Sequence, residues 1–508
     1  MYRLLRLDEP KLVFGHNQQM EDPRDGLGLF GTFDLNQLRS IRAAYVGTKD
    51  GIRRFQSWVE TMQRPIVNPK PTRDRPMFPG FEAVFGVAWN PAPVLRLEID
   101  EQTLLKQLNL DDLHQRIYGT VSLYEQRILD AIQAEEERPD IWFIIVPDKV
   151  YERCRPKSSV PFAQREAPVV KLKRKEATMI ARDGLLPGIM PEVEQAAQPY
   201  AYVPDFRNQL KGRLLATKAL TQIVRESTVA CEDFLTPWGK PERNLLNLAA
   251  DIAWNLSTAI AYKAGAKPWK LAGVRPGVCY LGLVFKQDLT SPDARSACSA
   301  AQMFLDSGDG VVFRGAKGLW YSPNSSQYHL DQPAAAQLVA KAIEAYRNKN
   351  DDKVPDELFI HGRVRFNDDE WAGFQEGAGK GTSVVGVRIN RGSDLRLFRQ
   401  ENSMPIMRGL ACVPDERTGI LWTNGFVPRL GTSTAREVPR PILVEIACGN
   451  APIQTVLQDV MGLTKLNYNC CRFTDGLPVT LRFADAVGEI LTSGPVSTDA
   501  PMPFRHYI

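Results

Sequence analysis

The chain has 508 residues, of which 44% are hydrophobic and 24% are charged, a composition typical of globular proteins and unlike that of disordered or fibrous chains. Its length allows two to four domains. Basic side chains exceed acidic ones by only four, which does not by itself indicate a nucleic-acid-binding protein. The basic residues are concentrated in residues 151–225, which contain 14 Lys or Arg against 7 Asp or Glu.

Neither a targeting segment nor a membrane span is visible in the sequence. The amino-terminal residues are charged every few positions and lack the apolar core of a signal peptide. No run approaches the ~18 apolar residues that a membrane helix needs. The eight cysteines are scattered without a CxxC pair, which indicates reduced thiols rather than a zinc site or a disulfide framework. We therefore expect a cytoplasmic protein with no membrane contact.

The first 150 residues alternate strand and helix signals. Residues 41–47 (IRAAYVG) are a short apolar run, and Thr48 is a suitable N-cap for a helix that continues through Met62. Apolar residues of the segment 117–132 fall on one helical face. The run IWFIIV at 141–146 follows as a fully buried strand. Continuous apolar strands between helices predict a parallel α/β sheet.

The segment from 153 to 202 is rich in Pro, Lys and Glu and predicts a solvated loop. A helix is predicted over 206–220, a strand over 221–225, and a long amphipathic helix over about 242–263. The side chains expected on the inward face of the long helix are Leu245, Leu248, Ile252 and Leu256.

The pattern changes near Gly273. Strands are predicted at 278–285, 299–305, 311–313, 358–361 and 383–389, with a hairpin turn at 306–310. Helices are predicted at 332–347, 453–466 and 478–491. Three antiparallel strands followed by alternating helices and strands are the chain order of an RNase H-like domain. We predict one α/β domain over residues 1–272 and a second over 273–508.

Two motifs are set aside. The segment GAGKGT at 377–382 lacks the first glycine and the final Ser or Thr of a phosphate loop and precedes a strand, so we expect a flexible turn. No nucleophile elbow accompanies the isolated histidines. We expect structural or surface roles for His329, His361 and His506.

One cluster of residues fits the binding of a terminal phosphate. Arg207 and Lys211 are four positions apart and leave one face of the predicted helix together. Thr221 and Gln222 open the next strand, and Lys263 ends the long helix. A phosphate needs cations for charge and amide donors for its oxygens. The spacing alone, however, favours an ordinary basic surface helix over a phosphate site.

The same residues resemble the pocket for the guide 5′ end in the MID domain of Argonaute proteins. The chain departs from that family at Arg207, where an aromatic residue or histidine is usual, and at Ala264 and Ala266. The second half resembles the PIWI domain, through segments that occur in the family's order: GVCYLGLVF, AAQMFLDSGDG, ELFIHGRVRF, LTKLNYN and PVTLRFADAVGEIL. The resemblance implies a Rossmann-like MID domain followed by an RNase H-like PIWI domain.

The whole chain, including LDEPKLVFGH and RDGLGLFG, resembles short prokaryotic Argonautes, closest to those paired with a TIR–APAZ or sirtuin-like–APAZ protein. The resemblance implies a 5′-phosphorylated guide RNA and a single-stranded DNA target. It also implies a heterodimer with an APAZ-bearing effector, usually NAD-degrading, that forms higher oligomers on activation and acts against invading DNA. A TIR effector is favoured, with sirtuin-like and nuclease effectors as alternatives. Mg²⁺ is implied at the guide 5′ end, shared with the carboxylate of Ile508.

The slicer positions of the family are degenerate here. Two-metal hydrolysis needs clustered carboxylates, but Val284 and Arg363 stand at two of these positions, and Asp485 alone retains a carboxylate. The resemblance therefore implies a protein that binds nucleic acid without cutting it. A rival hypothesis is an active nuclease that uses other carboxylates, and a third is a structural partner that binds no guide. The carboxylates considered for the nuclease are Asp306, Asp309 and Asp368.

Overall fold

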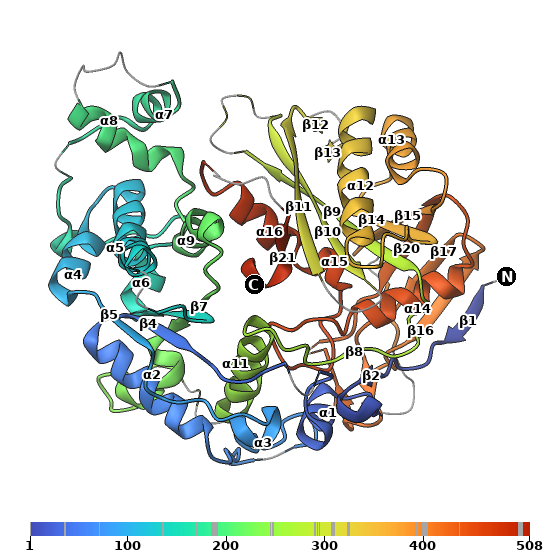
Figure 1. The fold of residues 1–508 in the computed structure, drawn as a ribbon, viewed down its shortest axis with the longest axis horizontal. Helices are drawn as coiled ribbons and strands as arrows, with labels where there is room; N and C mark the ends of the chain where they lie inside the picture. The colour runs from blue at the N-terminus through green and yellow to red at the C-terminus, as the bar shows by residue number, and fades with distance from the viewer. Residues whose placement is uncertain are drawn as a thin grey trace.

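The computed structural model describes residues 2–508 except 35–36, 71, 135–136, 169, 184–190, 244, 246–247, 289–290, 292, 294, 306–309, 323–325, 392–394, 399–404, 436 and 496–500. Figure 1 shows two α/β halves, blue to green and yellow to red, with the carboxy-terminal end of the sequence between them. Each half is built on its own sheet. The predicted α/β class is confirmed.

The first half contains a parallel four-stranded sheet in the order β5-β4-β6-β7. Its strands are β4 (Ala43–Gly47), β5 (Leu95–Glu98), β6 (Ile141–Val146) and β7 (Thr221–Arg225). Its helices are α1 (Pro23–Phe30), α2 (Lys49–Met62), α3 (Phe81–Phe85), α4 (Glu101–Asn109), α5 (Leu113–Gln133), α6 (Asp148–Arg153), α7 (Arg174–Asp183), α8 (Pro191–Ala197), α9 (Phe206–Leu214), α10 (Glu226–Val229) and α11 (Ala249–Lys263).

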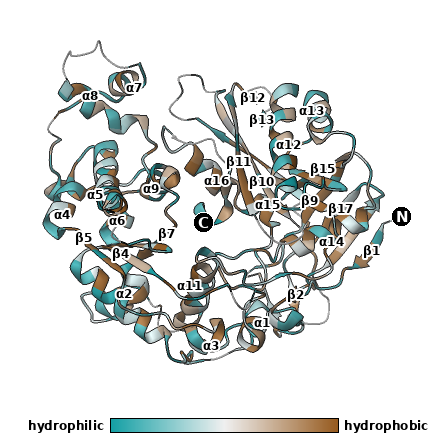
Figure 2. Ribbon diagram, viewed as in Figure 1, coloured by the Kyte–Doolittle hydropathy of each residue, from teal (hydrophilic) through white to brown (hydrophobic). Residues whose placement is uncertain are grey.

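Helices cover both faces of this sheet. The Thr48 hydroxyl accepts from the Gly51 N–H at 3.0 Å and starts α2 as predicted. Alternate strand residues face opposite sides, so Tyr45 belongs to the cluster that includes Phe55 of α2. Its neighbour Val46 belongs to the cluster that includes Tyr124 of α5. The apolar strands between the helices are brown in Figure 2.

The second half is organised around a sheet with the described strand order β1-β16-β17-β20-β15-β14-β9-β10-β11-β21. The antiparallel strands β9, β10 and β11 lie beside the parallel strands β14 and β15, as in the predicted RNase H-like arrangement. The bounds are β1 (Arg3–Arg6), β9 (Val278–Gln287), β10 (Ala297–Leu305), β11 (Gly310–Gly318), β14 (Glu357–Gly362), β15 (Ser383–Asn390), β16 (Leu410–Asp415), β17 (Thr418–Leu421), β20 (Ile442–Cys448) and β21 (Met502–Pro503). Small pairings are made by β2 (Leu12–Val13), β3 (Gln19–Met20), β8 (Lys270–Leu271), β12 (Tyr321–Ser322), β13 (Gln327–Tyr328), β18 (Phe426–Val427) and β19 (Thr432–Ser433).

The helices of this half pack on opposite faces of the sheet. Leu281 and Met303 share a cluster with residues of α12 (Gln332–Arg347) and α13 (Asp368–Ala378). Phe304 shares the other cluster with residues of α14 (Ile453–Leu463), α15 (Val479–Arg482) and α16 (Ala484–Leu491). Helix α16 lies on the side of the sheet that faces the first half (Figure 1).

Several predicted elements have different limits. The helix expected over 206–220 ends at Leu214, and a 3-10 turn leads to Lys218 in the left-handed conformation. The helix expected from 242 begins at Ala249, and the preceding segment makes an isolated antiparallel bridge between Leu235 and Pro241 instead. The helix expected over 478–491 is divided into α15 and α16 at Phe483.

Other segments are more ordered than predicted. The expected loop at 153–202 contains α7 and α8, whose sequences are rich in the helix formers Ala, Glu, Lys and Arg. The first two residues of the GAGKGT segment end α13, and Gly379 caps it at a φ of 72°. Strand β1 joins the sheet of the second half through β16, a pairing that four mostly exposed residues do not predict. Of the predicted hairpin turn at 306–310, residues 306–309 lie outside the described residues, and Gly310 is the first residue of β11.

No helix in the described part of the chain combines the length and apolar character needed to cross a membrane.

Candidate functional site

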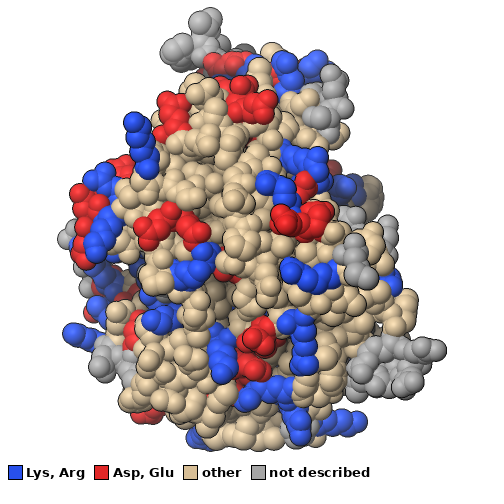
Figure 3. Space-filling view, turned by 90° about the vertical axis from the view of Figure 1, so that its right-hand side faces the viewer, with Lys and Arg blue, Asp and Glu red and all other residues tan. Residues whose placement is uncertain are grey.

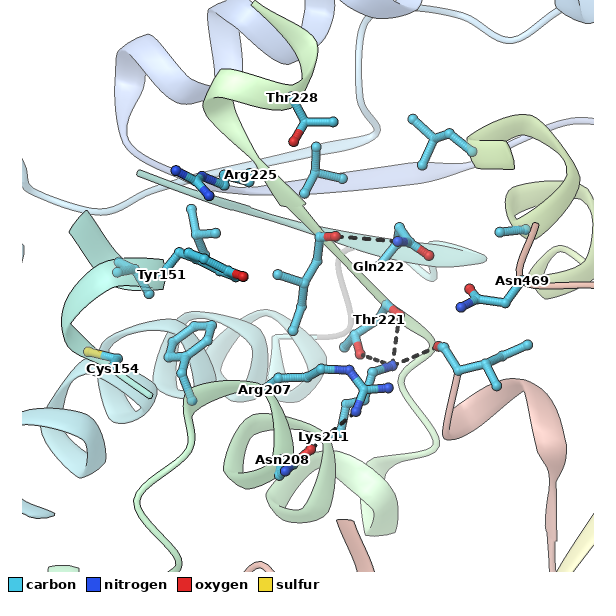
Figure 4. A pocket seen from close by; sticks show the side chains of 18 of the residues that line it. Tyr151, Cys154, Arg207, Asn208, Lys211, Thr221, Gln222, Arg225, Thr228 and Asn469 are labelled. Carbon is cyan, nitrogen blue, oxygen red and sulfur yellow. Dashed lines mark hydrogen bonds between the residues drawn. The ribbon is translucent and has the colours of Figure 1, made fainter. Parts of the chain in front are cut away.

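A cavity of about 720 Å³ lies between the first sheet and the end of the chain. Its lining comes mainly from α6, α9, β7 and α11, with Glu489 of α16 and the last residue, Ile508. Figure 4 shows Arg207 and Lys211 of α9 beside Thr221 of β7. The cavity brings together every residue predicted for a phosphate site, although they come from three elements and the chain end. These residues are Arg207, Lys211, Thr221, Gln222, Lys263 and Ile508.

Each element presents its side chain for a local reason. The carboxylate of Asp205 accepts from the Asn208 N–H at 2.9 Å and caps α9, which places Arg207 and Lys211 one turn apart on the cavity side. Thr221 is the first residue of β7, and Lys263 is the last residue of α11. The cavity therefore forms where two helix ends meet the start of a strand.

Two buried lysines, Lys211 and Lys263, line the cavity. Lys211 Nζ donates to the Ile508 main-chain oxygen at 2.9 Å and to both oxygens of Thr221 at 3.3 Å. Lys263 Nζ donates to the Thr221 carbonyl at 3.0 Å and to Gln222 Oε1 at 2.6 Å. Only 5% of Lys211 and 1% of Lys263 is exposed. None of these side-chain partners is a carboxylate.

The two lysines are buried beside a third cation, Arg207. Burial lowers the pKa of Lys211 well below its usual range, and Lys263 and Arg207 lower it further. Burial, followed by the charge of Arg207, lowers the pKa of Lys263 to about 7. Burial also lowers the pKa of Arg207. A bound anion would restore these pKa values, because it favours the charged form of each cation.

Arg207 links the cavity to the end of the chain. Its guanidinium donates to the Tyr507 carbonyl at 3.0 Å and to Asn208 Oδ1 at 3.1 Å. His506 is buried beside the cluster, and burial together with Arg505, Lys211 and Lys263 lowers its pKa to about 4.

The cavity also contains residues that the sequence did not single out. The guanidinium groups of Arg155 and Arg225 each lie 4.5 Å from the centre of the Tyr151 ring. Arg243 and Asn469 complete this side. Tyr151 lies on α6 and Arg225 on β7, whereas Arg155, Arg243 and Asn469 lie outside the helices and strands. No spacing in the sequence could therefore have joined them. The predicted inward residues Ile252 and Leu256 also line the cavity and are only half-buried.

The predicted slicer positions lie around α16. Val284 is buried on β9, and its Cγ1 would lie 3.3 Å from a Cβ placed on Gly488 of α16. Arg363, just after β14, donates to Asp485 of α16 at 3.0 Å. Within the described residues no group of three or more His, Cys, Asp or Glu is placed to hold a metal ion.

The carboxylates of the rival nuclease hypothesis lie elsewhere. Asp368 occupies the first turn of α13, next to the capping box formed by Asn367 and Glu370. Asp306 and Asp309 lie outside the described residues. Two of the histidines have side-chain partners, since His361 Nδ1 lies 2.8 Å from Thr480 Oγ1 and His329 Nδ1 lies 2.8 Å from Glu370.

No family model and no curated protein sequence matches this chain, but solved structures match it over nearly its whole length. Clostridium butyricum Argonaute, bound to a guide DNA and a 19-mer target DNA, gives a TM-score of 0.60 at 14% identity, over 98% of this chain and 54% of its own. Aquifex aeolicus Argonaute gives 0.54 at 12% identity, over 99% of this chain and 57% of its own. Aa-Ago with externally bound siRNA gives 0.56 at 12% identity, over 99% and 56%. The chain spans about half the length of these proteins.

At these identities the comparisons define the fold. This chain has the Argonaute fold, with a Rossmann-like MID half followed by an RNase H-like PIWI half. The boundary near Gly273 and the roles of the cavity residues stay predictions.

Proposed function

We propose that this protein binds the 5′-phosphate of a guide RNA in the cavity and uses the guide to recognise single-stranded DNA. The supporting observation is the cluster of Arg207, Lys211 and Lys263 around a single cavity, where no Asp or Glu side chain of the described residues bonds to either lysine. A terminal phosphate supplies further negative charge and several acceptor oxygens. Base pairing then reads the sequence, and the protein holds the duplex by its backbone.

Mg²⁺ belongs to the same proposal. The carboxylate expected on Ile508 is an oxygen ligand at the cavity, and hard cations such as Mg²⁺ prefer oxygen. When bound, the ion would reduce the repulsion between the Ile508 carboxylate and the guide phosphate. Lys211 would bind and orient both anions.

We further propose that the protein does not cleave its target. Val284 supplies no ligand, and Arg363 puts a cation beside Asp485, whereas two-metal hydrolysis requires clustered anionic ligands. Any effect on the cell would then come from a partner chain. The resemblance to short prokaryotic Argonautes supports a partner that carries an APAZ domain and an NAD-degrading effector domain, with TIR favoured. The complex would act against invading DNA in the cytoplasm.

The test compares 5′-phosphorylated with 5′-hydroxyl guides on wild-type protein and on Lys211→Ala. A charge-assisted contact contributes about 1.5–3 kcal/mol, so the variant should bind the phosphorylated guide roughly ten- to a hundredfold more weakly. Binding of the hydroxyl guide should change little. Lys106→Ala, which removes an exposed lysine on α4, is the matched control.

Thermal unfolding of Lys211→Ala shows whether the buried substitution leaves the fold intact. If a folded variant retains the full preference for the 5′-phosphate, or if the wild type has none, the phosphate site lies elsewhere.

A further inference from the structure

Helix α16 carries a solvent-facing stripe with two carboxylates. Ala484, Val487 and Ile490 are buried against the sheet, whereas Asp485 and Glu489 are not. Since they are four positions apart, they share one face of the helix and are separated by about 6 Å along its axis.

Each carboxylate is paired with a cation from the sheet below. Asp485 accepts from Arg363, which follows β14, at 3.0 Å. Glu489 accepts from Lys286 of β9 at 3.1 Å, and the Lys286 side chain also packs against α16 at Gly488. The two pairs therefore repeat the same arrangement one helical turn apart.

Both pairs are accessible to a ligand. The exposed fractions are 52% for the Arg363 side chain and 62% for Asp485, and 31% and 43% for Lys286 and Glu489. Exposed ion pairs contribute about 0–1 kcal/mol, so replacing either carboxylate by another anion costs little. A phosphate presents its oxygens to a guanidinium in the same geometry as a carboxylate does.

The row of cations continues directly from the cavity. Glu489 lines the cavity and accepts from the side-chain amide of Asn208, which neighbours Arg207 on α9, at 3.4 Å. A strand anchored by its terminal phosphate would pass Lys286 and then reach Arg363 along α16. By contrast, basic and acidic groups are interspersed on the outer face of the second half (Figure 3).

We propose that Lys286 and Arg363 bind backbone phosphates of the guide–target nucleic acid, and that Glu489 and Asp485 occupy these cations until the nucleic acid displaces them. The proposal rests on the proposed function, because it needs a strand that starts in the cavity. A strand whose phosphates do not displace Asp485 and Glu489 from Arg363 and Lys286 therefore binds more weakly. Arg363 thus gives the slicer position a role in holding the backbone.

The test is a double-mutant cycle with Arg363→Gln and Asp485→Asn. Each protein is loaded with a 5′-phosphorylated guide RNA, and its affinity for a complementary single-stranded DNA is measured between about 50 and 200 mM salt, where phosphate contacts are strongly salt-dependent. Arg363→Gln should weaken target binding about three- to tenfold. Asp485→Asn should strengthen it about two- to fivefold, which corresponds to the ~1 kcal/mol of an exposed pair.

The double-mutant cycle separates displacement from general repulsion. Arg363→Gln should flatten the slope of log affinity against log salt by about 0.7–0.9, the value for one phosphate contact, whereas Asp485→Asn with Arg363 present should raise the affinity without adding a contact. In the Arg363→Gln protein the same change should leave the slope unaltered and give a smaller gain in affinity. Equal effects of Asp485→Asn in both backgrounds would overturn the proposal.

Controls distinguish this inference from the proposed function. Arg347→Gln and Asp352→Asn break an exposed ion pair of 2.7 Å beside α12, on the opposite face of the sheet, and should leave target binding unchanged. Guide loading and the preference for the 5′-phosphate are measured on the same proteins. Failure of the wild type to load a guide refutes the proposed function, whereas normal loading with an unresponsive Asp485→Asn refutes only the displacement.

Discussion

Binding of the guide 5′-phosphate should be coupled to proton uptake by the cavity. Without an anion, burial and the charge of Arg207 lower the pKa of Lys263 to about 7, so much of this lysine is neutral at pH 8. A phosphate dianion favours the ammonium form and raises the pKa towards the usual 10.4. Binding therefore takes up about half a proton at Lys263 at pH 7 and close to one at pH 8. Burial lowers the pKa of Lys211 as well, so Lys211 acts in the same direction.

The size of the effect follows from the pKa of Lys263 without an anion, about 7, and from its usual value of about 10.4. If binding raises the pKa of Lys263 by one to three units, the affinity for a phosphorylated guide should fall about fivefold to fiftyfold between pH 7 and pH 9. The phosphate has a second pKa of about 6 and is dianionic throughout this range. His506, with a pKa of about 4, remains neutral.

Stability of the guide-free protein should change in the opposite direction. The unfolded chain keeps Lys263 protonated up to its usual pKa, so it binds more protons than the folded chain between about pH 7 and pH 10. This lysine therefore makes the folded state more stable as pH rises through that interval. Lys263→Met should reduce both effects, leaving the contribution of Lys211.

The assay is equilibrium binding of 5′-phosphorylated and 5′-hydroxyl guides at pH 7, 8 and 9, at constant ionic strength. The preference for the phosphate should decrease with pH in the wild type and decrease less steeply in Lys263→Met, where Lys211 remains buried. Calorimetry in two buffers of different ionisation enthalpy counts the protons directly. A preference that is constant or grows with pH in the wild type would refute the reasoning.

Two further predictions follow from the slicer positions and from the resemblance to short Argonautes. Guide-loaded protein should leave a fully paired target intact with Mg²⁺ or Mn²⁺, because Val284 and Arg363 supply no anionic ligand; metal-dependent products that disappear in Asp485→Ala would contradict this. Activity in cells should require an APAZ-bearing partner, so we expect copurification as a heterodimer. An isolated monomer that binds guide and target as tightly as any complex would argue against a partner.

Local patterns in the sequence determined most of the secondary structure. The apolar run IWFIIV forms the fully buried strand β6. Thr48 starts α2 because its hydroxyl accepts from a free N–H of the first turn. The phosphate-site residues were also identifiable, but only through the resemblance, since the spacing of Arg207 and Lys211 by itself favoured a surface helix.

The tertiary structure decided which residues meet. Lys211 and Ile508 are 297 positions apart and lie 2.9 Å from one another, and β1 pairs with β16 across some 400 residues. Neither contact has a local signature, because each depends on how the two sheets and the chain end pack. The same packing buries Lys211 and Lys263, and burial is the main cause of their lowered pKa values. The sequence thus determines which residues are cationic, whereas the fold determines their hydrogen-bond partners and, through burial, their pKa values.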